Sequence, residues 1–138
     1  MKSNASLPQE RSENVSAKRT VVYIEDNTTI RQLVRYIMEM HPDISLMEAE
    51  TGTQGLAIIK QCQPDLILLD LHLPDMDGFT LFSLLQNDPM TVNIPVVALS
   101  GSAAPADIQR GKAIGFKRFL AKPINVKEFN STLSTILG

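Results

Sequence analysis

The feature that most constrains the fold is a series of short apolar runs with helical patterns between them. Three runs are continuous and apolar, at 21–24, 66–69 and 96–99, and a shorter one covers 119–121. A further segment, at 44–46, alternates apolar with polar residues. Continuous runs are typical of strands buried on both faces of a parallel sheet, whereas alternation favours a strand at the sheet edge.

The segments between these runs repeat apolar residues at helical spacing. In the first of them the apolar residues recur every three or four positions, and Asn27 or Thr28 is expected to cap the helix. In the last, Asn125 followed by Glu128 resembles a capping box. Strand–helix alternation repeated five times predicts an α/β fold, with a doubly wound five-stranded parallel sheet covered by helices on both faces.

The first part of the chain differs from the rest in composition. Residues 1–19 are rich in Ser, Asn, Glu and Lys, with few residues that can be buried. Such a segment does not bury enough apolar surface to offset its ordering entropy, so we expect a flexible tail or linker. Residues 20–138 are then one domain, because 138 residues are too few for two substantial cores.

Charge and composition exclude several classes of function. The formal net charge is -2, so no global field attracts the chain to nucleic acid or to an anionic membrane. No apolar run approaches the roughly 20 residues of a membrane helix, and no secretory signal is visible, so a cytoplasmic location is expected. The single cysteine, Cys62, excludes an internal disulfide and a cysteine-rich metal site.

Polar side chains follow four of the five predicted strands. The first run ends in Glu25 and Asp26, the third in Asp70, the fourth in Ser100 and the fifth in Lys122. Because the carboxyl ends of parallel strands lie along one edge of a sheet, these side chains are expected to converge there, where such folds bind ligands.

The residue types at this edge favour phosphoryl chemistry. Three carboxylates repel one another unless a cation joins them, and oxygen-only ligands suit Mg²⁺. With Lys122 opposite, the space between the cations suits a phosphoryl group. Asp70 can then act as the nucleophile, and Ser100 can donate a hydrogen bond formed only after transfer, which provides a switch.

Four stretches of the chain carry a family resemblance, at 23–27, 68–78, 98–101 and 120–123. In content, order and spacing they resemble the receiver domain of response regulators in bacterial two-component signalling, and the likeness covers about residues 20–137. The resemblance implies a flavodoxin-like fold with strand order 2-1-3-4-5.

The resemblance also implies a role for each matching position. Asp70 resembles the phosphoacceptor. Asp26 resembles the residue that binds Mg²⁺ directly, and Glu25 one that binds it through water. The backbone carbonyl of His72 resembles a further metal ligand, while its imidazole is expected to line the rim of the site.

The remaining positions are those of the phosphate contacts and the switch. Lys122 resembles the phosphate-binding lysine, followed by a cis bond to Pro123, a form essentially confined to proline. Ser100 and Phe119 resemble the switch pair, in which the aromatic ring swings inward when the serine moves.

A second surface is expected to bind partners. Residues 108–127 collect six Lys and Arg side chains, and Pro105 and Gly115 are expected to bound a helix with a thin apolar face. In receivers this region docks partners or a second copy, so 104–127 is the predicted surface for a downstream protein and for a possible homodimer.

Other motifs have simpler interpretations. Asp75 to Gly78 resembles the start of a phosphatase motif or a calcium loop, but a turn is favoured, with Gly78 supplying an unusual backbone angle. No G-x-S-x-G elbow and no phosphate-binding G-x-x-x-x-G-K-[ST] loop is present in the sequence.

The sequence is compatible with three functions. The leading one is a phosphorelay receiver fed by a histidine kinase or a histidine phosphotransfer protein. It is either a free-standing regulator or a segment of a hybrid sensor kinase, whose receivers it resembles. The second is a pseudo-receiver that binds partners without phosphorylation, and the third is a small phosphatase.

Overall fold

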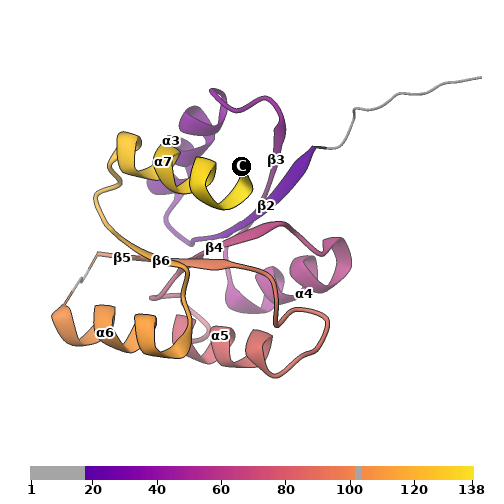
Figure 1. Cartoon of the computed structure of the whole chain (residues 1–138), viewed down its shortest axis with the longest axis vertical. Helices are drawn as coiled ribbons and strands as arrows, with labels where there is room; N and C mark the ends of the chain where they lie inside the picture. The colour runs from indigo at the N-terminus through magenta and orange to yellow at the C-terminus, as the bar shows by residue number, and fades with distance from the viewer. Residues whose placement is uncertain (1–17, 102–103) are drawn as a thin grey trace, which may run out of the picture.

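A computed structural model describes residues 18–101 and 104–138. Its five strands form one parallel sheet in the order β3-β2-β4-β5-β6, which is the predicted order 2-1-3-4-5 (Figure 1). The alternating segment is an edge strand, β3, as predicted. The strands are β2 (Arg19–Ile24), β3 (Ile44–Ala49), β4 (Leu66–Asp70), β5 (Val96–Ser100) and β6 (Arg118–Ala121).

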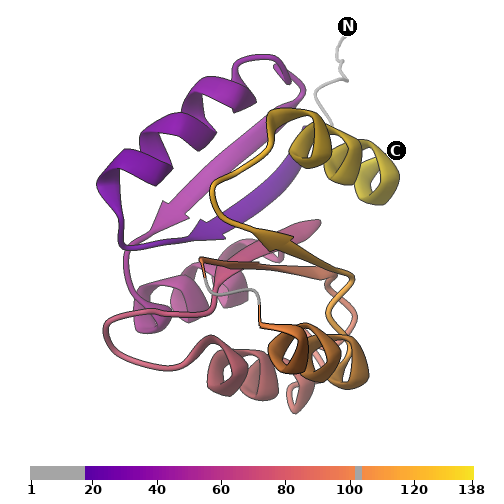
Figure 2. The ribbon, with the colours of Figure 1, turned by 90° about the vertical axis from the view of Figure 1, so that its left-hand side faces the viewer.

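Five helices cover the two faces of this sheet. Helices α3 (Thr28–Met38) and α7 (Val126–Leu137) lie on one face; α4 (Gly52–Cys62), α5 (Gly78–Gln86) and α6 (Pro105–Ile114) lie on the other (Figures 1 and 2). The expected caps are present, because the side chain of Asn27 accepts from the Ile30 N–H and that of Asn125 from the Glu128 N–H.

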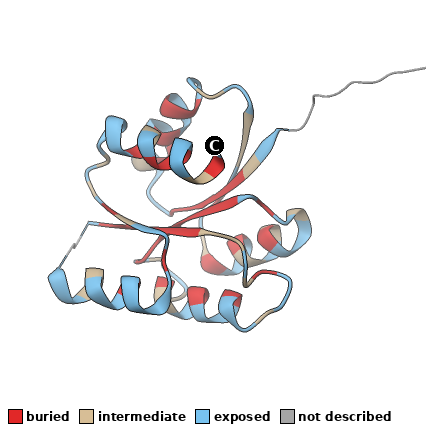
Figure 3. Cartoon of the chain, in the orientation of Figure 1, coloured by how far each residue is buried: buried red, intermediate tan, exposed pale blue. Residues whose placement is uncertain are grey.

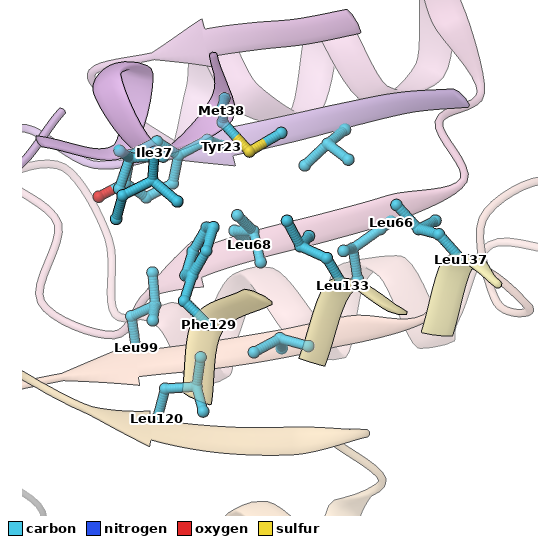
Figure 4. Packing of buried hydrophobic residues seen from close by; sticks show 13 residues of the cluster. Tyr23, Ile37, Met38, Leu66, Leu68, Leu99, Leu120, Phe129, Leu133 and Leu137 are labelled. Atoms are coloured by element: carbon cyan, nitrogen blue, oxygen red, sulfur yellow. The ribbon is translucent and has the colours of Figure 1, made fainter. Parts of the chain in front are cut away.

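The alternation of side chains along each strand divides the core in two. On β2, Val21 and Tyr23 face helices α3 and α7, whereas Val22 and Ile24 belong to the core under α4 and α5. Figure 4 shows the first cluster, in which side chains of the strands, such as Leu68, lie among side chains of α3 and α7, such as Ile37 and Phe129. Both faces of the central strands are thus apolar, which explains their continuous apolar sequences.

Helix α6 is anchored by few buried residues. Gly111 is its only described buried residue, and Ile108 is half-buried, in agreement with the predicted thin apolar face (Figure 3). A Cβ at Gly111 would lie 2.8 Å from the Phe116 ring, so the glycine permits a close approach. A helix with so few anchoring contacts is suited to movement.

The prediction that Gly78 supplies an unusual backbone angle is wrong. In the described ranges, positive φ angles occur at Gln63, Gly115 and Gly138 but not at Gly78. What Gly78 provides is space, since a Cβ there would lie 2.6 Å from the Leu71 Cα. The segment before it is a loop that bends at 74–76, and Asp77 caps α5 by accepting from the Phe79 N–H.

The predicted tail at 1–19 lies outside the described residues except for Lys18 and Arg19, and Arg19 already belongs to β2. Within residues 18–101 and 104–138, no helix has both the length and the apolar character needed to cross a membrane.

Candidate functional site

The carboxyl ends of the strands bring the predicted acidic and basic groups together. The Lys122 Nζ lies 2.6 Å from Oε1 of Glu25 and 3.4 Å from Oδ1 of Asp70. One carboxylate oxygen from each of Glu25, Asp26 and Asp70 lies within 4.8 Å of the other two. Residues far apart in the chain therefore form one site, because β2, β4 and β6 run in the same direction.

Ser100 lies at the same edge. It is buried, it ends β5, and its carbonyl accepts a hydrogen bond of 2.9 Å from the backbone N–H of Lys122. The neighbouring strand β4 ends at Asp70, which pairs with Leu99 in the sheet register. The serine is therefore held close to both Asp70 and Lys122 by the backbone of the adjacent strands.

Glu25 is the most buried of the acids, with 0% of its surface exposed. Its Oε1 accepts from the Tyr23 hydroxyl at 3.4 Å and its Oε2 from the Asn27 N–H at 3.2 Å. Burial raises the pKa of Glu25; the hydrogen bond from Lys122 opposes this shift, and the neighbouring Asp70 adds to it. Burial also raises the pKa of Tyr23, so its phenol remains a neutral donor.

Asp70 is buried and held in one orientation. The backbone N–H of His72 donates to its Oδ1 at 3.1 Å, and the Lys122 ammonium approaches the same oxygen. These contacts fix the direction of a carboxylate oxygen at the end of β4, and a carboxylate can act as the nucleophile in phosphoryl transfer.

The donor set fits a hard divalent cation. Three carboxylates converge, of which Asp26 is exposed to solvent, and each offers only oxygen atoms. One lysine does not balance three acids, so a further positive charge would stabilise the cluster. Oxygen ligands with an open, solvated side are what Mg²⁺ prefers.

The other predicted residues surround this centre. His72 is exposed, its backbone forms an isolated antiparallel β-bridge with Asp77, and its N–H donates to Asp70, so the residue lies next to the acidic site. The Lys122–Pro123 peptide bond is cis, as the resemblance implies. Phe119 is half-buried on β6, beside Ala98 of β5 in the sheet register.

Two residues have structural roles that were not predicted from the sequence. Arg31 is buried on the inner face of α3, and Asp75 joins the loop after β4 to α4. Arg31 shares its helix face with Val34 and Ile37, so a charged residue at an apolar position was a visible signal. Asp75 had no comparable signal, because its partners are 22 and 23 residues away in sequence.

The interaction of Asp75 predicts an acid-sensitive contribution to stability. Its carboxylate accepts from the Thr53 hydroxyl and from the Gly52 and Thr53 N–H groups, which lowers its pKa from 3.8 to about 2. Since the native state favours the charged form, this contribution is complete above the ordinary pKa of 3.8 and is lost as the pH falls through about 2. We expect Asp75→Ala to be less stable than wild type in urea unfolding at pH 7, with a smaller difference at pH 3. An equal difference at both pH values would contradict this assignment.

Comparison with known proteins agrees with the geometry. Residues 21–134 match the family described as response regulator receiver domain. The chain is 36% identical over 117 residues to the DNA-binding dual master transcriptional regulator RpaA of Synechocystis, covering 85% of this chain and 48% of that protein. It is 30% identical to the polar-differentiation response regulator DivK of Brucella ovis, covering 87% of this chain and 97% of DivK.

Solved structures share the fold. The Mn²⁺-bound form of the response regulator Rcp1 is 26% identical and superposes with a TM-score of 0.74, covering 86% of this chain and 91% of Rcp1. The chain spans only about half the length of the transcriptional regulators that it matches.

Proposed function

This chain belongs to the response regulator receiver domain family of two-component signalling, and we propose that its Asp70 accepts a phosphoryl group from a phosphohistidine. The observation that carries the proposal is the position of Asp70, which is buried beside Lys122 and within reach of two further carboxylates. Receivers are phosphoacceptors rather than enzymes acting on other substrates, so the chain is proposed to catalyse only its own phosphorylation and dephosphorylation.

In the proposed reaction, a carboxylate oxygen of Asp70 attacks the phosphorus of the phosphohistidine. A phosphorus–oxygen bond forms, the phosphorus–nitrogen bond breaks, and its electron pair returns to the imidazole, which takes up a proton. Lys122 offers an ammonium 3.4 Å from Asp70, where it can attract the phosphoryl oxygens. Positioning and charge neutralisation are the main requirements of phosphoryl transfer.

Mg²⁺ is the proposed cofactor. Asp26 and Asp70 would hold it directly, Glu25 through water, and His72 through its backbone carbonyl. When bound, it would neutralise charge on the acids and on the phosphoryl oxygens. The convergence of three carboxylates supports this assignment, as does the Mn²⁺ bound by the related Rcp1.

Ser100 and Phe119 are the proposed switch. A hydrogen bond from Ser100 to the new phosphoryl group would move the segment after β5, and Phe119 would swing inward. The weak anchoring of α6 supports such movement. The surface at 104–127 is then the proposed site for a downstream protein or a second copy, and the proposed output is protein contact in the cytoplasm without direct nucleic-acid binding.

The proposed function can be tested against its two alternatives with acetyl phosphate. We expect the Mg²⁺-loaded protein to gain the mass of one phosphoryl group, measured on the intact chain, and to lose it again over time. A pseudo-receiver would gain no mass. A phosphatase would instead hydrolyse unrelated phosphomonoesters with repeated turnover.

An apolar rim beside the site is the proposed contact for the phosphodonor. Ile30 and Leu33 of α3 line a hollow together with Lys122, Pro123 and Ile124. A protein that brings a phosphohistidine to Asp70 must approach this rim, because Lys122 belongs to both the hollow and the acidic site. Apolar side chains at such a rim lose contact with water when a partner covers them, which favours binding.

This assignment predicts a selective defect in Leu33→Glu. Leu33 is 39% exposed, so the charge is tolerated in the free protein but opposes burial against a partner. Fully burying a leucine contributes about 1.5–3 kcal/mol, of which the exposed 39% of Leu33 can contribute roughly 1 kcal/mol on binding. A glutamate at this position must in addition lose its water, so phosphotransfer from a phosphorylated histidine phosphotransfer protein is expected to slow by about tenfold. Labelling by acetyl phosphate should be unchanged.

Leu84→Glu is the matched control, because Leu84 is 45% exposed and lies on α5, which covers the opposite face of the sheet (Figure 1). Equal slowing in both variants, or slower labelling by acetyl phosphate in Leu33→Glu, would argue against a donor surface at this rim.

A further inference from the structure

Arg31 is a buried cation whose position the proposed function does not explain. It lies on the inner face of α3 with only 6% of its surface exposed, in line with Val34 and Ile37. Burying a guanidinium is costly unless its charge and its donors are satisfied. The partners that satisfy it therefore indicate what the residue does.

Those partners are the backbone of the acidic pair and two acids at the end of the edge strand. The Nη1 of Arg31 donates to the carbonyl of Glu25 at 2.9 Å and to that of Asp26 at 3.3 Å. Its Nη2 lies 3.2 Å from Oε2 of Glu50, and its Nε lies 3.3 Å from Oε1 of Glu48. One planar group thus connects α3, the end of β2 and the end of β3.

The two carbonyls belong to the residues whose side chains converge on the cation site. Glu25 and Asp26 lie between the end of β2 and the start of α3, outside both elements. The guanidinium holds both carbonyls from the side of α3. Holding these two carbonyls fixes the backbone from which both side chains extend, and so limits the directions that the two carboxylates can take.

We propose that Arg31 is a positioning residue, whose guanidinium holds the carbonyls of Glu25 and Asp26 so that their carboxylates converge on a divalent cation. The inference rests on the proposed function, because it assigns a role toward that same site. Groups that orient metal ligands in this way typically change metal affinity by about 10–100-fold when they are removed.

Simple electrostatics predicts the opposite result, which makes the inference testable. Arg31 is a cation near a cation site, so removing only its charge would strengthen Mg²⁺ binding. If Arg31 acts by position, its loss must weaken binding instead. Glu48 and Glu50 already balance its charge, which favours the positional effect.

The experiment measures Mg²⁺ dissociation constants by isothermal titration calorimetry for wild type, Arg31→Met and Arg31→Lys, far below each melting temperature. We expect about tenfold weaker binding in Arg31→Met. Arg31→Lys should also bind more weakly, because an ammonium does not reproduce the forked geometry that joins the carbonyls to two acids. If Arg31→Met does not fold, Arg31→Lys decides the question.

Arg35→Gln is the matched control. Arg35 is on the same helix one turn later, pairs with Glu48 at 2.6 Å and is 49% exposed at its side chain. It shares an acid with Arg31, whereas the hydrogen bonds to the two carbonyls come from Arg31. Its removal should change Mg²⁺ affinity by less than about twofold, because an exposed ion pair contributes little.

Unchanged or tighter binding in both Arg31 variants would overturn the inference and leave the proposed function intact. Equal weakening in Arg35→Gln would also overturn it, because the effect would then belong to the shared Glu48 network. Two results would refute the proposed metal site and the role of Arg31 together. One is that the wild type binds no Mg²⁺, and the other is that Asp26→Asn binds Mg²⁺ with the same affinity as the wild type.

Discussion

Replacing Asp70 with Asn is expected to abolish phosphorylation completely. The amide has nearly the same shape as the carboxylate, so the buried end of β4 would be kept, but an amide oxygen is not a nucleophile for phosphoryl transfer. Incubation of Asp70→Asn with acetyl phosphate and Mg²⁺ should leave the intact mass unchanged, whereas the wild type gains one phosphoryl group.

The structure supplies controls for this result. Asp75→Asn and Asp77→Asn alter carboxylates in the loop after β4 that accept hydrogen bonds from backbone N–H groups at the starts of α4 and α5. Both variants should still be labelled. A phosphoryl adduct on Asp70→Asn would show that the acceptor lies elsewhere.

The second large effect is expected in Lys122→Met. The ammonium lies 2.6 Å from the fully buried Glu25, and removing one partner of a buried ion pair leaves an uncompensated charge. Such a change lowers the free energy of unfolding by about 3–5 kcal/mol. Without metal we expect a decrease of about 3 kcal/mol here, because Glu25 can become neutral by taking up a proton. Urea unfolding in the presence of a chelator measures this loss.

The sign of the pH dependence follows from Glu25. Burial raises its pKa, so the native state binds the proton more tightly than the unfolded chain does. Stability associated with this group is therefore present below its ordinary pKa of 4.5 and is lost as the pH rises through the raised pKa. The hydrogen bond from Lys122 lowers the pKa of Glu25, so its loss raises that pKa further in the variant, and the stability deficit of Lys122→Met should be larger at pH 8 than at pH 5.

The double variant Glu25→Gln/Lys122→Met tests the cause directly. With the carboxylate removed there is no buried charge to compensate, so most of the lost stability should return. A Lys122→Met protein as stable as wild type, or a double variant no more stable than Lys122→Met, would show that the ion pair contributes little to folding.

Local sequence patterns were sufficient to predict the fold, because strand burial and helix capping depend on residues that are close together in the sequence. Continuous apolar runs report strands buried on both faces, and capping residues such as Asn27 and Asn125 act within three positions of themselves. The direction of parallel strands then brings their carboxyl ends to one edge, which is why Asp70 and Lys122 were expected together before any distance was known.

Contacts between residues far apart in the sequence were harder to predict. The expected role of Gly78 was wrong because a glycine permits either an unusual angle or a close approach, and only the packing of the start of α5 against Leu71 distinguishes them. The hydrogen bonds of Asp75 to the start of α4 depend on how the loop after β4 folds across another helix.

The architecture and the set of charged groups at one edge could be predicted from the sequence alone, and the sheet order from its family resemblance. The folded chain was needed to show that Glu25 is fully buried, that Lys122 contacts it more closely than it contacts Asp70, and that Arg31 holds the backbone of the acidic pair. The difference lies in the sequence distance over which each kind of interaction acts. Apolar periodicity and capping are local, whereas burial and ion pairing depend on side chains that approach only after the strands and helices have packed.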